Sequence, residues 1–234
     1  MNEHISSAYD RDLESIQTLI VKMGGMVEHA ILEAAKALES RDIERADVVR
    51  KGDKAIDALE EQINEEAART IALRAPVSKD LRALLSVLKL ASSLERVGDY
   101  AKNMAKRTPI LAEMAPISGA DAALRRMSKE VQSMLRDALD AFIRRDVKLA
   151  ENVRQRDLEV DQMYNALFRE FLTFMMEDPR NISACMHMHF IAKNVERMGD
   201  LVTNMAEQVI YMVSGVMPED DRPKMGSTAT AKDI

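Results

Sequence analysis

The chain has 234 residues, of which 47% are hydrophobic and 31% charged, and its formal net charge is -6. This mild acidity, without any run of basic residues, disfavours a protein that binds nucleic acid through its phosphates. Eight glycines, six prolines and no tryptophan favour a helical protein with a sizeable core over a sheet protein or a disordered chain.

Between the glycines and prolines, apolar residues recur at three- and four-residue spacings, which indicates long amphipathic helices. The turns at residues 41–42 and 145–146 offer Asp42 and Asp146 as N-caps. Pro76 and Pro179 end the second and fifth helices, since a residue before proline resists the helical conformation. We therefore expect six helices, spanning residues 8–39, 43–74, 78–112, 119–144, 147–177 and 181–215.

The two halves of the chain repeat one another. The segment ERVGDYAKNMA (residues 95–105) recurs as ERMGDLVTNMA (residues 196–206), with seven of eleven letters identical. The turn at residues 41–42 matches that at 145–146 with an offset of 104 residues, and the offset falls to 101 at the repeated motif. We interpret this as internal duplication of an all-α unit. The predicted architecture is two tandem three-helix bundles of long antiparallel helices, residues 1–112 and 113–217, followed by a disordered tail, residues 218–234.

Pairs of acidic residues four apart lie on the core-side faces of these helices. At about 100° per residue, Glu95 and Asp99 continue the apolar line of Leu81, Leu84 and Leu88. The same geometry holds in both halves, where one helix carries a DxxxD pair and the next carries an ERxGD pair. The candidate residues are Asp53, Asp57, Glu95 and Asp99 in the first half, and Asp157, Asp161, Glu196 and Asp200 in the second.

Four carboxylates that face inward need compensating positive charge, because like charges repel and burial adds a desolvation cost. Metal ions are one solution: oxygen ligands suit Mg, Mn, Ca or ferric iron, and zinc also accepts carboxylates. Asn103 and Asn204 would then add carbonyl oxygens beside the sites. Gly98 and Gly199 would allow a neighbouring helix or a ligand to approach closely.

Two alternatives remain open from the residues alone. In a plain helical scaffold, arginines neutralise the acids through salt bridges, with Arg96 and Arg197, or Arg50 and Arg154, as candidates. In a metal-dependent hydrolase or oxidase, a bridged pair of ions activates water. The sequence contains no recognisable catalytic constellation, and glycine stands at 98 and 199, where an oxidising di-iron site would need histidine. We therefore expect a protein that is not an enzyme.

The cysteine content and the lack of long apolar segments predict the cellular compartment. A single cysteine, Cys185, cannot form an internal disulfide and fits a reducing compartment. No apolar run is long enough to cross a membrane, and the N-terminus has no apolar signal core. We expect a soluble cytoplasmic protein.

Paired three-helix halves, each with DxxxD on the second helix and ERxGD on the third, resemble the PhoU family. The likeness also covers LTFMMEDPR (residues 172–180) and NVERMGDLVTNMAEQVIYMVSG (residues 194–215). The resemblance implies a negative regulator of phosphate uptake and of the phosphate-starvation response. It implies two partners, the ATPase of the phosphate ABC transporter and a sensor histidine kinase, so that contact with the membrane is only peripheral. It also implies a homodimer and metal ions (Fe, Zn, Mn or Mg) bound by the eight acids named above.

Overall fold

The computed structural model describes residues 2–219, with side chains from residue 8 onward, so most of the predicted disordered tail lies outside the described residues. Within that range the chain is helical and contains no strand. None of the described helices is long and apolar enough to cross a membrane. The elements are α1 (Asn2–Ser40), α2 (Ile43–Arg74), α3 (Lys79–Ala105), α4 (Thr108–Ala112), α5 (Ala120–Arg144), α6 (Val147–Glu177), the 3-10 turn η1 (Pro179–Asn181) and α7 (Ile182–Ser214).

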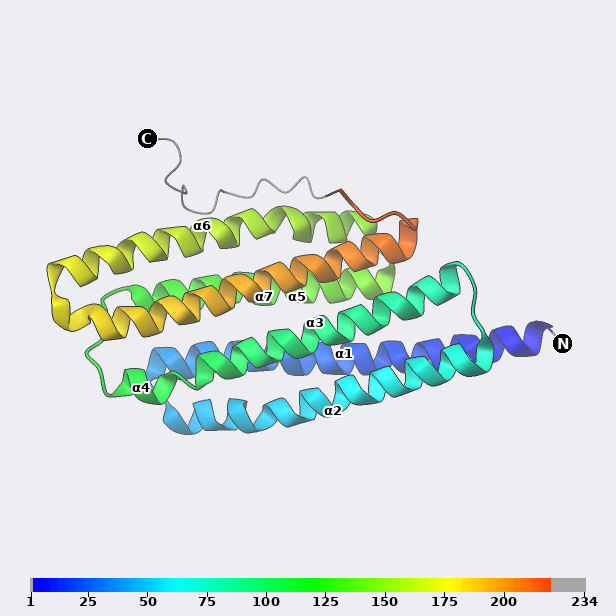
Figure 1. Cartoon of the computed structure of the whole chain (residues 1–234), viewed down its shortest axis with the longest axis horizontal. Coiled ribbons are helices and arrows are strands. Elements are labelled where there is room, and N and C mark those ends of the chain that lie inside the picture. The colour runs from blue at the N-terminus through cyan, green and yellow to red at the C-terminus, as the bar shows by residue number, and fades with distance from the viewer. Residues whose placement is uncertain (1, 220–234) are drawn as a thin grey trace.

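The six long helices form two antiparallel three-helix bundles that lie side by side (Figure 1). Helices α1, α2 and α3 pack on one another, as do α5, α6 and α7, and the two bundles meet where α3 packs on α7 and α1 on α5. Buried apolar side chains from both halves belong to one continuous core. The all-α, duplicated architecture expected from the sequence is confirmed.

The third predicted helix is the main departure from expectation. The sequence predicts a helix over residues 78–112, but α3 ends at Ala105 and the short helix α4 follows. Pro109 lies in the first turn of α4 and has no N–H to donate to the carbonyl of Ala105, so α3 cannot continue through it. The chain turns at residues 106–107 and then carries α4 into the junction between the halves.

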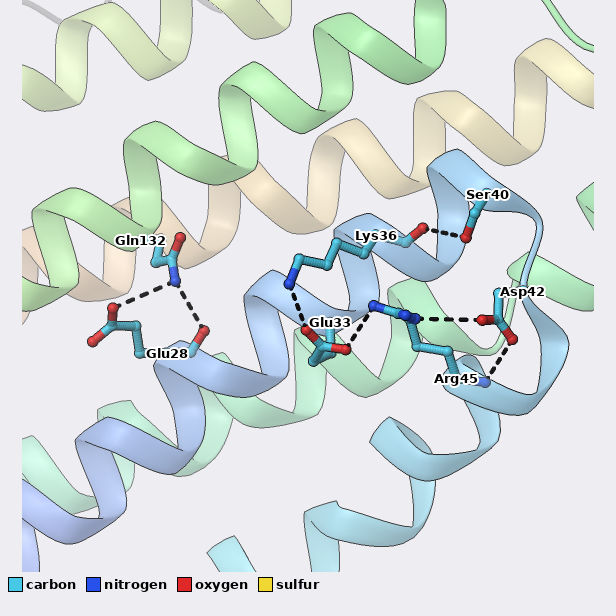
Figure 2. A network of polar contacts seen from close by, with 7 residues as sticks. All are labelled: Glu28, Glu33, Lys36, Ser40, Asp42, Arg45 and Gln132. Carbon is cyan, nitrogen blue, oxygen red and sulfur yellow. Dashed lines mark hydrogen bonds and ion pairs between the residues drawn. The ribbon is translucent and has the colours of Figure 1, made fainter.

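Both predicted N-caps form. The side chain of Asp42 accepts a 2.9 Å hydrogen bond from the backbone N–H of Arg45, as Figure 2 shows. The side chain of Asp146 accepts hydrogen bonds of 2.9 and 3.1 Å from the N–H groups of Lys148 and Leu149. These bonds satisfy N–H groups that the first turn of a helix leaves without intrahelical partners.

Asp146→Ala is expected to lower the free energy of unfolding by about 1 kcal/mol, because it removes the cap and leaves two N–H groups of α6 to water. Urea unfolding followed by circular dichroism measures the loss. Asp146→Asn is the matched control: it keeps an oxygen acceptor, so its free energy of unfolding should stay close to that of the wild type. A loss as large for asparagine as for alanine would contradict the capping role.

The contact between α1 and α5 joins equivalent positions of the two halves. Gln132 on α5 donates hydrogen bonds of 3.4 Å to both the backbone carbonyl and the side chain of Glu28 on α1 (Figure 2). The two residues are related by the duplication offset of 104. One turn earlier on α1, Gly24 faces Leu139, and a Cβ atom added to this glycine would overlap that side chain. The absence of a side chain at Gly24 therefore permits the close packing of the bundles.

Candidate metal centre

The structure brings the acids of the first half together between α2 and α3. Asp53 is buried, with 4% of its surface exposed, and faces α3. Lys102 of α3 hydrogen-bonds to Asp53 Oδ2, and the same ammonium lies 3.0 Å from Asp99 Oδ1. One lysine therefore bridges one acid from each predicted pair.

Charge crowding in this cluster perturbs its other acids. Burial raises the pKa of Asp57, and the neighbouring charge of Asp53 raises it further, against the opposing effect of Lys102. The pKa of Glu95 is also raised, first by burial and then by the charges of Asp99 and Glu60. A site that disfavours its own ionised carboxylates in this way gains from any additional cation.

Glu60 joins the cluster although the paired motif did not include it. Burial and the charge of Asp57 raise its pKa. Its position three residues after Asp57 was the available signal, because residues three apart share a helix face.

The second half places Asp157 of α6 against α7. Asp157 is buried, with 9% of its surface exposed. A Cβ atom added to Gly199 would lie 3.5 Å from Asp157 Oδ1, so this glycine lets the carboxylate approach α7. Asp161 follows Asp157 by one turn, and Asp200 follows Glu196 by one turn, each partly exposed.

Glu196 is the most informative acid of this second cluster. Its Oε1 atom accepts a 2.5 Å hydrogen bond from Lys193, whose ammonium also lies 5.1 Å from the ring centre of Tyr164. Its Oε2 atom is buried and, among the described residues, has no hydrogen-bond partner. A buried carboxylate oxygen without a donor is costly, and a cation is one ligand that would relieve the cost.

Lysines pair with three of these acids: Lys102 with Asp53 and Asp99, and Lys193 with Glu196. Arg96 and Arg197 are both exposed. Arg50 lies 3.7 Å from Asp47, and Arg154 pairs with Glu151 and Glu207. The signal for Lys102 and Lys193 was their spacing of three residues from Asp99 and Glu196.

The lysine that pairs with the acids occupies a different position in each half. At the motif offset of 101, the equivalent of Lys102 is Thr203, whose hydroxyl donates to the carbonyl of Gly199 at 3.0 Å. The equivalent of Lys193 is Ser92. Asn103, the predicted supporting residue, accepts a 3.1 Å hydrogen bond from Lys106, and Asn204 lies exposed toward α3.

The donor set is compatible with hard cations, since it consists of carboxylates with the unsatisfied Oε2 of Glu196 among them. Across residues 2–219, the protein atoms alone hold no three acidic, histidine or cysteine side chains gathered as a ready set of metal ligands. In the first half, Lys102 stands between Asp53 and Asp99, so a metal ion there would compete with its ammonium. The eight acids therefore remain predicted ligands.

Comparison with known proteins places this architecture in a family. A family model described as the PhoU domain matches residues 20–108 and 124–209, one stretch in each half. A relative from Caulobacter vibrioides, named phosphate-specific transport system accessory protein PhoU homolog, is 44% identical over 225 residues, covering 96% of this chain and 98% of that protein. A relative of the same name from Zymomonas mobilis is 46% identical over 222 residues, covering 94% and 93%.

Two solved structures have the same fold. The crystal structure of PhoU from Pseudomonas aeruginosa is 39% identical, with a TM-score of 0.86, and covers 89% of this chain and 100% of that one. The crystal structure of the phosphate transport system regulatory protein PhoU from Streptococcus pneumoniae is 29% identical, with a TM-score of 0.84, and covers 90% and 99%.

Proposed function

The chain belongs to the PhoU family, and on that basis we propose that it is a non-enzymatic regulator of phosphate transport. The observation that carries the proposal is the full-length match to relatives named as accessory proteins of the phosphate-specific transport system. We infer further that it acts in the cytoplasm as a homodimer. Its proposed partners are the ATPase of the phosphate transporter and a sensor histidine kinase, and its proposed effect is to lower starvation signalling when phosphate is plentiful.

A deletion strain tests this role. In phosphate-rich medium, cells without the protein should show raised expression of a phosphate-starvation reporter and altered phosphate uptake, and the intact gene should restore both. Direct binding of the purified chain to the purified transporter ATPase and to the kinase tests the partners, and light scattering tests the dimer. Unchanged reporter expression in the deletion strain would overturn the regulatory role.

The proposed metal ligands are the eight acids of the two clusters. A bound ion would add positive charge beside these carboxylates, and it would join α2 to α3 and α6 to α7. The crowding that raises the pKa of Asp57 and Glu95, and the unsatisfied Oε2 of Glu196, support this proposal. In a plain scaffold, by contrast, Lys102 and Lys193 would suffice.

We expect added Mn²⁺ or Fe³⁺ to raise the melting temperature of metal-free protein. An ion present at ten times its Kd adds about 1.4 kcal/mol to the free energy of unfolding if it binds only the folded state. For a chain of this size that corresponds to a rise of roughly 3–5 °C. Differential scanning calorimetry measures the shift, and elemental analysis of the native protein identifies the ion.

The double variant Asp99→Asn, Asp200→Asn is the control for this shift, because it removes one carboxylate charge from each cluster at nearly constant volume. Its melting temperature should respond weakly to metal. If wild type and variant shift equally, the ions bind elsewhere. If neither shifts and the native protein contains no metal, the scaffold interpretation is correct.

A further inference from the structure

Two lines of side chains border the seam where α3 packs on α7 (Figure 1). Residues at successive spacings of four, seven and seven lie on one face of a helix, within about 40° of one another. Such a line occurs at equivalent positions of the two helices, Leu85, Lys89, Arg96 and Asn103 on α3 and Met186, Phe190, Arg197 and Asn204 on α7. Asn103 is partly exposed and the other seven are exposed. We call these eight residues the α3–α7 face.

The contacts across the seam show that both lines border it. Lys89 and Arg96 line a groove of about 240 Å³ together with Asn204 of the opposite helix. Further along the seam, the guanidinium of Arg107, which follows α3, lies 4.5 Å from the ring centre of Phe190. The two helices therefore run antiparallel, so the apolar residues of the face lie toward its two ends and its arginines lie between them.

The α3–α7 face contains cations and no acid, although the net charge of the chain is -6. Two of these cations, Arg96 and Arg197, are the arginines of the repeated ERxGD motif, and neither has an ion-pair partner among the described residues. Asp99 of the same motif lies toward α2, where it shares Lys102 with Asp53. Both halves therefore present an exposed motif arginine that can pair with an acid outside this chain.

We propose that the α3–α7 face binds an acidic helix of a protein partner. The carboxylates of this helix pair with the arginines, and its apolar side chains pack on Leu85, Met186 and Phe190, each of which is at least 40% exposed. From Leu85 to Asn103 the face is about 27 Å long, a length that a partner helix of about 18 residues spans. An amphipathic helix lying in a groove is a recurrent mode of recognition. The inference rests on the proposed regulatory function, because it assigns the surface with which the regulator holds a partner.

Charge and shape favour this occupant over two others. A second copy of the chain would bring arginines against arginines across this face, and like charges in contact repel, so a homodimer would form through another surface. A membrane surface is flat, whereas the hydroxyls and amides that line the groove are placed to hydrogen-bond to inserted side chains. Because the chain as a whole is acidic, an acidic partner is repelled elsewhere and steered to this face.

Photo-crosslinking of the full chain in cells tests the occupant. Phe190→p-benzoylphenylalanine places a photoreactive ring on the face, and mass spectrometry identifies the segment that it captures. We expect a protein segment rich in aspartate and glutamate. Leu73→p-benzoylphenylalanine, at an exposed apolar position of α2, is the control and should not capture that segment. Capture of lipid, of a second copy or of a segment without acids would overturn the proposal, and so would the absence of any capture.

Two double variants assign the binding to the arginines of the face. The captured segment is synthesised as a peptide, and fluorescence anisotropy measures its Kd for the full chain. Arg96→Gln with Arg197→Gln should raise this Kd at least about tenfold, since it removes two charged hydrogen-bond donors. Arg126→Gln with Arg169→Gln, which removes the same charge from exposed positions of α5 and α6, should change it less than about twofold. Equal losses in the two pairs would show general electrostatic attraction and overturn the site.

The deletion strain separates this proposal from the regulatory function. If starvation signalling is normal without the protein while the acidic segment is still captured, only the regulatory function is refuted. If signalling depends on the protein but no acidic segment is captured at position 190, only the role of the α3–α7 face is refuted.

Discussion

Lys102→Met should lower the free energy of unfolding by about 3 kcal/mol at pH 7 in metal-free protein. Methionine keeps the apolar stem of the lysine but removes the ammonium that bridges Asp53 and Asp99. Asp53 is almost fully buried, so its carboxylate would lose its cation where water cannot replace it. Urea unfolding at pH 7 measures the change.

The loss of stability in Lys102→Met should depend on pH. Burial and neighbouring acids already raise the pKa of Asp57, Glu60 and Glu95, so the folded state takes up protons more readily than the unfolded state. For an acid with a raised pKa, stability is lost as pH rises from the unfolded pKa, about 4, through the higher folded pKa. The charge of Lys102 lowers the pKa of Asp57, so removing it raises that pKa further, and the deficit of the variant should be largest at pH 7–8 and smaller at pH 5.

Lys102 itself stays charged across this range, because its hydrogen bonds to Asp53 and Asp99 raise its pKa above the ordinary value. Its stabilising contribution is therefore present throughout pH 5–8 and is lost only at strongly alkaline pH. Lys106→Met is the matched control, since Lys106 is exposed and bonds only to the amide of Asn103 among the described contacts. If both variants lose the same stability, the bridge does not stabilise the fold. An equal deficit at pH 5 and pH 8 would contradict the charge argument.

Local sequence signals were sufficient for most of the helices. Asp42 and Asp146 marked helix starts that the structure confirms, and the helices over 43–74 and 147–177 agree residue for residue with prediction. The helical period placed Asp157 in line with an apolar stripe, whereas the line through Asp53 was more polar and less decisive; both residues are buried. The end of α3 before Pro109 was not predicted, because apolar residues continue at helical spacing on both sides of this proline. The spacing of apolar residues gives no sign that the proline lacks the N–H group needed for the next helical hydrogen bond.

The partners of the acids were harder to predict, because they depend on how helices pack. Arg96 and Arg197 belong to the repeated ERxGD motif, which made them candidates to neutralise the acids. Both are exposed. Lys102 and Lys193 are not repeated between the halves, so the duplication gave no reason to select them. Likewise, the packing of α3 on α7, which joins the two bundles, is a contact that no local pattern specifies.

Packing between the bundles is also the basis of the second large effect. Gly24→Leu should lower the free energy of unfolding by about 2–3 kcal/mol, the typical cost of adding bulk to a packed core. Leucine would place its Cβ against Leu139 of α5, which is itself nearly buried, so α1 and α5 would have to separate. The Glu28–Gln132 hydrogen bonds one turn away would weaken with them.

Gly25→Leu is the matched control. It makes the same substitution at the next residue of α1, where the surroundings are different. A Cβ atom at Gly25 meets nothing within 4 Å. Leucine is also a better helix former than glycine, so this variant should be as stable as the wild type or more stable by about 0.5 kcal/mol. Urea unfolding followed by circular dichroism compares the two variants directly.

Because the buried core runs continuously through both halves, Gly24→Leu should shift one cooperative transition, not split it in two. Two separate transitions would show that each three-helix bundle is stable alone, and equal stability of the two variants would show that the α1–α5 contact adds nothing to the fold.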